Sequence, residues 1–187
     1  MIFLLLFQDA HGETLTLETF ESSDVTIRYE KALKNAVPDV AEAYIRAGAE
    51  LERKMHLDLA LKPVIILIHT DSAFNSMVEG NKLITAFAVP GYNYIYIDYQ
   101  KMLKTPFDLE LTLTHELCHL LLHNYVQSDH LPKWLDEGVS QWVSGGIADI
   151  LNFDGKKLLK EAVISGKYLP LDDLALNFPA EENNLIL

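Results

Sequence analysis

The chain has 187 residues, of which 49% are hydrophobic and 22% charged, a composition that suits one globular domain with a buried core. Acidic residues outnumber basic ones by 27 to 15, and the formal charge of −12 argues against nucleic acid as a partner because phosphates would be repelled. No stretch reaches the roughly 20 apolar residues of a membrane-spanning helix, and the single cysteine, Cys118, excludes an intrachain disulfide.

Residues 1–24 form an N-terminal segment that can be interpreted in two ways. Residues 2–7 are all apolar, and Ala10-His11-Gly12 could pass for the small-residue cleavage site of a secretory signal peptide. The apolar run is nevertheless shorter than the roughly 7–15 residues expected, and no Lys or Arg precedes it. A clipped signal peptide and a first strand are therefore equally good interpretations.

Several short strands and one long helix are predicted before residue 100. Short apolar or alternating runs predict strands at residues 25–29, 63–69, 83–89 and 93–99. The last two are separated by Pro90-Gly91, a turn signal, and should form an antiparallel hairpin. Residues 38–57 carry apolar side chains at helical spacing and predict an amphipathic helix.

The rest of the chain is predicted to be helical. Thr105 can cap a helix, Pro106 suits its first turn, and Asp108 completes a capping-box-like pattern, so we expect a helix to about His123. Two further helices are predicted at residues 133–144 and 154–165, each ended by glycine. A small sheet followed by a helical half indicates an α+β domain.

The segment His115-Glu116-Leu117-Cys118-His119 has the HExxH pattern. Residues four apart on a helix lie on the same face, so the two imidazoles can bind one metal ion at about 2.0–2.1 Å. Glu116 lies about 100° round the helix, where its carboxylate can take a proton from bound water. Incidental histidines are the alternative, but unpaired polar side chains in so apolar a helix would each cost about 1–3 kcal/mol.

Glu137 is the predicted third ligand. Catalytic zinc sites keep three protein ligands and one open position, and two histidines with one glutamate form such a set. Seventeen residues separate His119 from Glu137, enough to turn at Pro132 and enter a second helix. The pattern therefore predicts one Zn²⁺ per chain, with an exposed helical glutamate as the alternative for Glu137.

These motifs resemble those of the gluzincin zinc metallopeptidases, and among them the peptidase MA-like group. The resemblance rests on residues 114–119 (THELCH) and on residues 132–138 (PKWLDEG), which match the P-x-W-L-x-E-G ligand helix of that group. A weaker likeness extends to residues 86–91 and 95–98, and in all it covers roughly residues 25 to 180.

The resemblance implies a zincin-like fold, in which a small mixed, twisted sheet packs on the HExxH helix and a helical subdomain follows. It implies that His115, His119 and Glu137 bind zinc, while Glu116 acts as general base and later as proton donor. The strand at residues 83–89 would form the edge above the cleft, where an extended peptide could pair with the backbone. The substrate-binding residues would then be Ala86, Phe87 and Ala88.

Two supporting roles stay open. Related enzymes often place a carboxylate one turn after the ligand glutamate to orient a ligating histidine, and Gln141 stands there. Asp136 is the alternative, although its position beside Glu137 is expected to turn it away from the same face. A Tyr or His often stabilises the oxyanion in gluzincins, and the candidates are His123, Tyr125, His130 and Tyr168.

We therefore predict that residues 25–187 form a zincin domain that cleaves peptide or protein substrates. The alternatives are a zinc-binding recognition or regulatory domain without catalysis and a metal-dependent hydrolase of a non-peptide bond. Relatives usually continue into a further helix, so the domain could extend past the apolar residues 185–187. An extracytoplasmic or secreted location agrees with the family and the apolar start, and a cytoplasmic one stays open. The sequence indicates neither substrate specificity nor oligomeric state.

Overall fold

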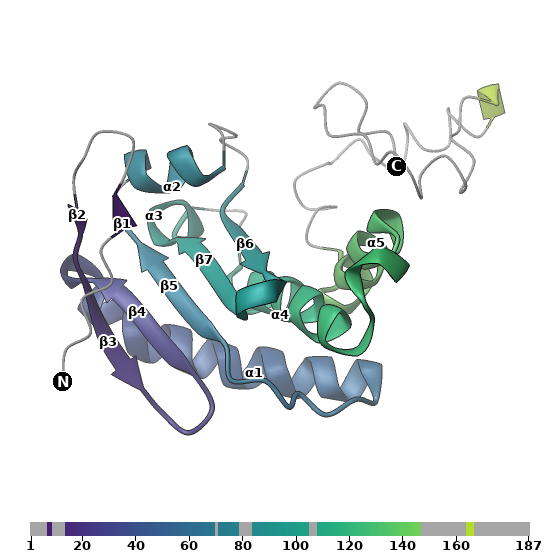
Figure 1. Ribbon diagram of the computed structural model, residues 1–187, viewed down its shortest axis with the longest axis horizontal. Helices are drawn as coiled ribbons and strands as arrows, with labels where there is room; N and C mark the ends of the chain where they lie inside the picture. Colours follow the sequence, from purple (N-terminus) through teal and green to yellow (C-terminus); the bar gives the residue numbers. More distant parts are fainter. Residues whose placement is uncertain are drawn as a thin grey trace.

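A computed structural model of the chain describes residues 7–8, 14–69, 71–78, 84–104, 108–146 and 164–166. A mixed five-stranded sheet lies at its centre, and helices pack against both faces (Figure 1). The mixture of sheet and helices confirms the α+β class predicted from the order of the elements. The finer zincin-like assignment stays a prediction.

The sheet combines parallel and antiparallel pairing. Its strands are β3 (Leu17–Glu21), β4 (Thr26–Glu30), β5 (Val64–Ile68), β6 (Ala86–Val89) and β7 (Tyr94–Asp98). They lie in the order β3-β4-β5-β7-β6, with β4, β5 and β7 parallel to one another and β3 and β6 antiparallel to their neighbours. The hairpin predicted around Pro90-Gly91 is confirmed by β6 and β7, and β6 lies at the edge of the sheet.

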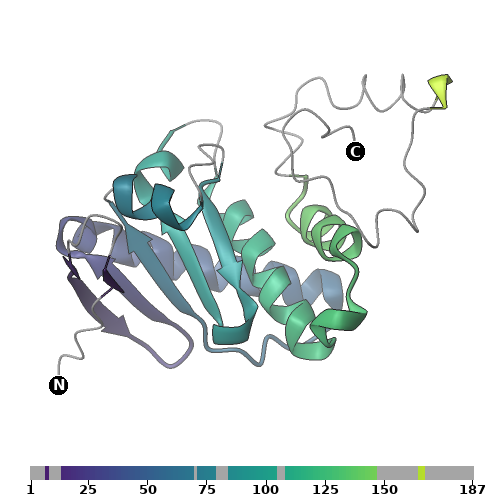
Figure 2. The ribbon, with the colours of Figure 1, turned by 45° about the horizontal axis from the view of Figure 1, so that its top comes forward.

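Two long helices cover one face of the sheet. They are α1 (Val37–Met55) and α4 (Leu109–Tyr125), which lie side by side (Figure 2). Side chains alternate along a strand, so Ile65 and Leu67 join the core under these helices while Ile66 and Ile68 face the other side. Helix α4 is in contact with α1, β6 and α5 (Lys133–Val143), so most of its middle residues are buried, polar ones included.

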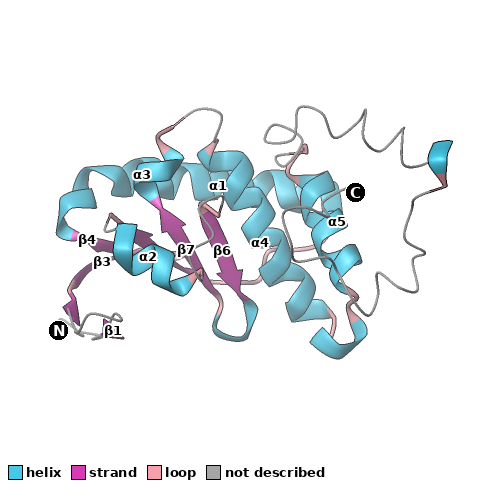
Figure 3. Ribbon diagram, turned by 90° about the horizontal axis from the view of Figure 1, so that it is seen from above, coloured by secondary structure: helices cyan, strands magenta, loops and turns pink. Residues whose placement is uncertain are grey.

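The opposite face is covered in part by α2 (Asp71–Met77) (Figure 3). Phe74 of α2 is completely buried there against the sheet residues Ile66, Ile68 and Tyr96. The remaining short elements are β1 (Phe7–Gln8), β2 (Thr14–Leu15), α3 (Tyr99–Met102) and three 3-10 turns, η1 (Lys31–Ala36), η2 (Pro90–Tyr92) and η3 (Ser128–His130).

The predicted start of the HExxH helix is wrong. Helix α4 begins at Leu109, and its N-cap is Asp108, whose extended backbone lets Oδ1 accept a hydrogen bond from the Leu111 N–H at 2.9 Å. Thr105 and Pro106, from which the earlier start was predicted, lie outside the described residues. The reason for the later start is local, since an aspartate directly before the first turn satisfies the free N–H groups itself.

Helix α5 agrees with the helix predicted at residues 133–144, and the Lys54 ammonium of α1 donates to the Val143 carbonyl near its C-terminal end at 2.8 Å. The helix predicted at residues 154–165 lies almost entirely outside the described residues, as do residues 2–6 of the N-terminal segment. Within the described part of the chain, no helix has both the length and the apolar character to cross a membrane.

Candidate metal centre

Helices α4 and α5 bring His115, His119 and Glu137 together. The two histidines lie one turn apart on α4, and Glu137 extends from α5 toward them. The His115 and His119 Nε2 atoms lie 3.1 Å apart, and Glu137 Oε2 lies 3.7 Å from the first and 3.8 Å from the second. A triangle with these sides has its centre about 2.1 Å from each corner, which is the bond length of zinc to imidazole and carboxylate.

The donor set also fits a metal ion chemically. Two imidazole nitrogens and one carboxylate oxygen suit a borderline divalent cation such as zinc and leave a coordination position open. Two ring nitrogens at 3.1 Å can share one proton or, when both are bare, hold one cation. The group His115, His119 and Glu137 could therefore hold a metal ion.

Asp136 determines which nitrogen of His119 faces that point. Its Oδ1 lies 2.7 Å from His119 Nδ1, and because an ionised carboxylate only accepts hydrogen bonds, Nδ1 carries the proton and Nε2 presents its lone pair. Asp136 was expected to turn away from the face of Glu137, but it still reaches the site. Asp136 and Glu137 do leave α5 in different directions, but they approach opposite edges of the same ring.

Neighbouring charges raise the pKa of His119 and lower the pKa of Asp136. Burial alone would lower the pKa of His119, but the hydrogen bond to Asp136 and the charges of Glu116 and Glu137 outweigh it, so that pKa is raised. Burial alone would raise the pKa of Asp136, but the hydrogen bonds and charges of His119 and His123 lower it. For Glu137 likewise, His115 and His119 outweigh burial and lower the pKa.

Glu116 lies buried beside this group. Burial raises the pKa of its carboxyl, and the charge of Glu137 adds to that effect, while His115, His119 and a backbone hydrogen bond from Ala88 act in the opposite direction. The carboxylate is thus close enough to the three ligand candidates to respond to their charges. It is held between α4 and the edge strand β6.

The backbone N–H and C=O groups of the edge strand β6 alternate between facing β7 and facing away from the sheet. The Asp98 N–H donates to the Thr85 carbonyl at 2.8 Å, so the alternation of an antiparallel ladder turns the N–H and C=O groups of Phe87 toward β7 and those of Ala86 and Ala88 away from it. The Phe87 ring stacks on Tyr96 at 4.9 Å between centroids. Of the three predicted substrate-binding residues, Ala86 and Ala88 therefore have outward-facing backbone groups and Phe87 does not.

The other predicted site residues are placed as follows. His123 contacts Asp136 and Ser128. The Tyr125 hydroxyl makes a long contact of 3.5 Å with the Asp58 carbonyl, on the side of α1. His130 is exposed in η3, and Tyr168 lies outside the described residues. The Gln141 backbone carbonyl accepts from the Gly146 N–H, near the end of α5.

Ser140 is the polar neighbour that sequence reasoning missed. It is completely buried, and its Oγ lies 3.3 Å from His119 Nδ1. Its position four residues after Asp136 places both on one face of α5, and this spacing was the available signal. His115 differs from His119, because its buried Nδ1 has no hydrogen-bond partner among the described residues.

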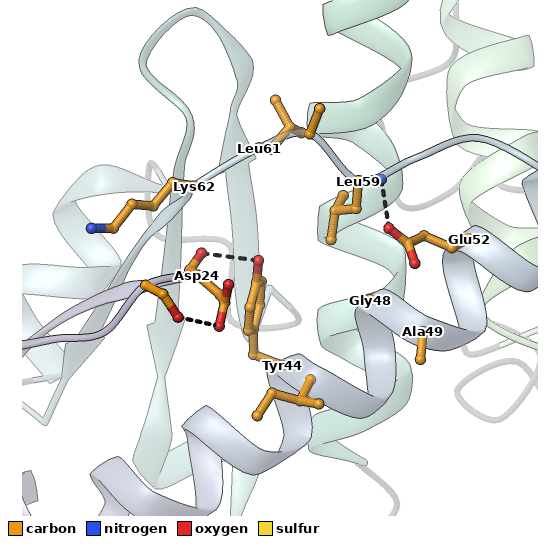
Figure 4. A pocket seen from close by; sticks show the side chains of 11 residues that line it. Asp24, Tyr44, Gly48, Ala49, Glu52, Leu59, Leu61 and Lys62 are labelled. Carbon is orange, nitrogen blue, oxygen red and sulfur yellow. Dashed lines mark hydrogen bonds between the residues drawn. The ribbon is translucent and has the colours of Figure 1, made fainter.

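A separate pocket lies elsewhere on the molecule. It has a volume of about 620 Å³ and is lined by α1, the turn before β4 and the segment that leads to β5 (Figure 4). Tyr44 donates to the Asp24 carbonyl at one side, and Glu52 accepts from the Leu59 N–H at the other. None of the candidate metal ligands lines this pocket.

No family model matches the chain, and no curated protein sequence matches it. The likeness to gluzincins therefore rests on the HExxH and ligand-helix residues, and it stays a prediction.

Proposed function

We propose that the protein is a zinc-dependent metallopeptidase. The observation that carries the proposal is the equidistant point about 2.1 Å from two imidazole nitrogens and one carboxylate oxygen, beside a buried glutamate. A metal-binding module without catalysis has no need of Glu116 so close to the ligands. This arrangement favours hydrolysis over recognition.

His115, His119 and Glu137 would hold the ion. Zinc bound there would polarise a carbonyl group and make water more acidic. The protein keeps His119 in the tautomer that metal binding requires, because the Asp136 carboxylate accepts a hydrogen bond from the Nδ1–H of His119. Glu137 stays ionised, since its pKa is lowered by the two histidines against the effect of burial.

Glu116 moves the proton. Its carboxylate accepts one proton from the attacking water as the water oxygen bonds to the carbonyl carbon. The same proton passes to the amide nitrogen as the C–N bond breaks, which regenerates the carboxylate. Burial raises the pKa of Glu116, which makes its carboxylate a stronger base toward the attacking water.

The edge strand supports a peptide as substrate. The outward N–H and C=O groups of Ala86 and the outward C=O of Ala88 could pair with an extended peptide in the manner of strand addition. The Ala88 N–H is already used by Glu116. A peptide on this edge would therefore run directly past the general base.

The test combines metal content with cleavage of unfolded casein. We expect about one zinc per chain in the wild type, chelator-sensitive cleavage, and loss of zinc in Glu137→Ala. Glu116→Gln should keep its zinc and lose cleavage by about 10²–10⁴-fold. Glu42→Gln, on the exposed face of α1, serves as a control for the loss of one carboxylate and should resemble the wild type.

Two results would contradict the proposal in different ways. Zinc bound at this site without any cleavage would favour the recognition module or a hydrolase of another bond. No zinc in the wild type would remove the metal centre altogether.

A further inference from the structure

The carboxylate of Asp136 has two histidine partners. Oδ1 lies 2.7 Å from His119 Nδ1, and Oδ2 lies 3.1 Å from His123 Nε2. His119 and His123 are four residues apart on α4, so they lie on one face of that helix. Asp136 stands in the first turn of α5 and thus joins the two helices that carry the candidate metal ligands.

Both ring nitrogens of His123 are engaged by the protein. Nε2 faces Asp136, and Nδ1 lies 2.9 Å from Ser128 Oγ, just before α5. One set of protons satisfies every contact: His123 donates from Nε2 to Asp136, and its Nδ1 accepts from the Ser128 hydroxyl. A histidine held in this way has no N–H left to donate to a substrate oxyanion, and His123 is not one of the three residues whose ligand atoms converge.

Two fixed oxygens constrain Asp136 more than one would. With Oδ1 bonded to His119 alone, the carboxylate could rotate about its last bond and α5 could shift along α4. The second hydrogen bond from His123 fixes the plane of the carboxylate and the position of the α5 backbone at residue 136. Glu137 is the next residue, so its carboxylate is placed against His115 and His119 by the same contacts.

We propose that His123 is a positioning residue of the metal centre, which holds Asp136 and through it both the His119 ring and Glu137. The proposal rests on the metal site of the proposed function. Removing such a supporting partner should weaken zinc binding by about 10–100-fold. The three ligand candidates converge only while α4 and α5 keep their separation. Removal of His123 should therefore lower the zinc affinity more than it lowers the stability of the fold.

The experiment measures Zn²⁺ affinity of the full chain by competition with a chromogenic chelator. His123→Ala should lose about 10–100-fold, and His123→Gln, whose amide can donate where Nε2 stood, should recover most of that loss. Ser128→Ala should lose less, in the same direction. His69→Ala is the matched control, because His69 is an exposed histidine that contacts Gln100 and not α5.

Cobalt substitution and unfolding of the metal-free chain separate positioning from other roles. We expect the visible spectrum of bound Co²⁺ to change in His123→Ala and to be restored in His123→Gln. Normal zinc affinity with lower stability would make His123 merely structural, and normal affinity with lost cleavage would place it on the substrate; either result overturns the proposal. A wild type without zinc would overturn the proposed function first, and this proposal with it.

Discussion

Asp136 and Glu137, adjacent on α5, contact the same imidazole from opposite edges: Asp136 Oδ1 lies 2.7 Å from His119 Nδ1, and Glu137 Oε2 lies 3.8 Å from Nε2. Neighbouring helix residues are separated by about 100°, which is enough to reach both edges of a ring that stands between the helices. Two acidic residues in sequence can therefore serve one histidine in two ways, one as its hydrogen-bond acceptor and the other as its companion ligand.

The hydrogen-bonded pair of His119 and Asp136 should make the stability of the metal-free protein depend on pH. The pKa of His119 is raised above 6.5, so its share is fully present below pH 6.5 and is lost as the pH rises through the raised value. The pKa of Asp136 is lowered from 3.8, so its share is present above pH 3.8 and is lost as the pH falls through the lowered value. The pair contributes most between these limits.

We therefore expect Asp136→Asn to lower the free energy of unfolding of the metal-free chain by about 1–3 kcal/mol near pH 5, and by less near pH 8. Urea unfolding in the presence of a chelator measures both values. An equal loss at the two pH values would mean that Asp136 acts through packing and not through the charge of His119.

The backbone N–H of Ala88 should tune the general base. Proline removes that donor, and an outward-facing position on an edge strand tolerates proline. We expect Ala88→Pro to keep its zinc and to lose about tenfold or more in cleavage. The hydrogen bond from Ala88 lowers the pKa of Glu116, so its removal should raise that pKa and shift the acid limb of the pH–rate profile to higher pH. Ala88→Ser keeps the N–H and should resemble the wild type; a loss of equal size there would point to the side chain instead.

The N-cap of α4 gives a prediction on stability. Asp108→Ala removes the acceptor for the Leu111 N–H and should cost about 1 kcal/mol. Asp108→Asn keeps a capping oxygen and should cost less. Chemical denaturation of the two variants compares them directly, and equal stability of Asp108→Ala and the wild type would show that the cap contributes nothing.

The features that could be predicted from the sequence are those set by residues only a few positions apart. The separation of His115 and His119 places them on one helical face, and the run at residues 93–99 predicted the strand that is found as β7. The prediction failed for elements that are set by contacts between residues far apart in the sequence. Strand β3 was not predicted, because a half-exposed strand with three charged or polar positions has no clear apolar pattern.

The role of Asp136 could not be derived from α4 and α5 taken separately. Helical spacing shows which residues share a face with Glu137, and this favoured Gln141. It does not show that the ring of His119 stands between the helices with both edges accessible, which depends on how the helices pack. The same packing places Ser140 on Nδ1 and His123 on the second oxygen of Asp136.

Gly48, in the middle of α1, offers a test of helix propensity against packing. Alanine is favoured over glycine in a helix by about 0.5–1 kcal/mol, but a Cβ here would lie 3.1 Å from Leu59 Cδ2. That atom is the far end of a half-buried side chain that borders the 620 Å³ pocket (Figure 4), so it has room to move by the few tenths of an ångström required. We expect Gly48→Ala to raise the free energy of unfolding by less than the full propensity gain. Gly138→Ala in α5, where a Cβ meets no described atom within 4 Å, should show the full gain, so a destabilised Gly48→Ala beside a stabilised Gly138→Ala would mean that Leu59 is held rigidly in place.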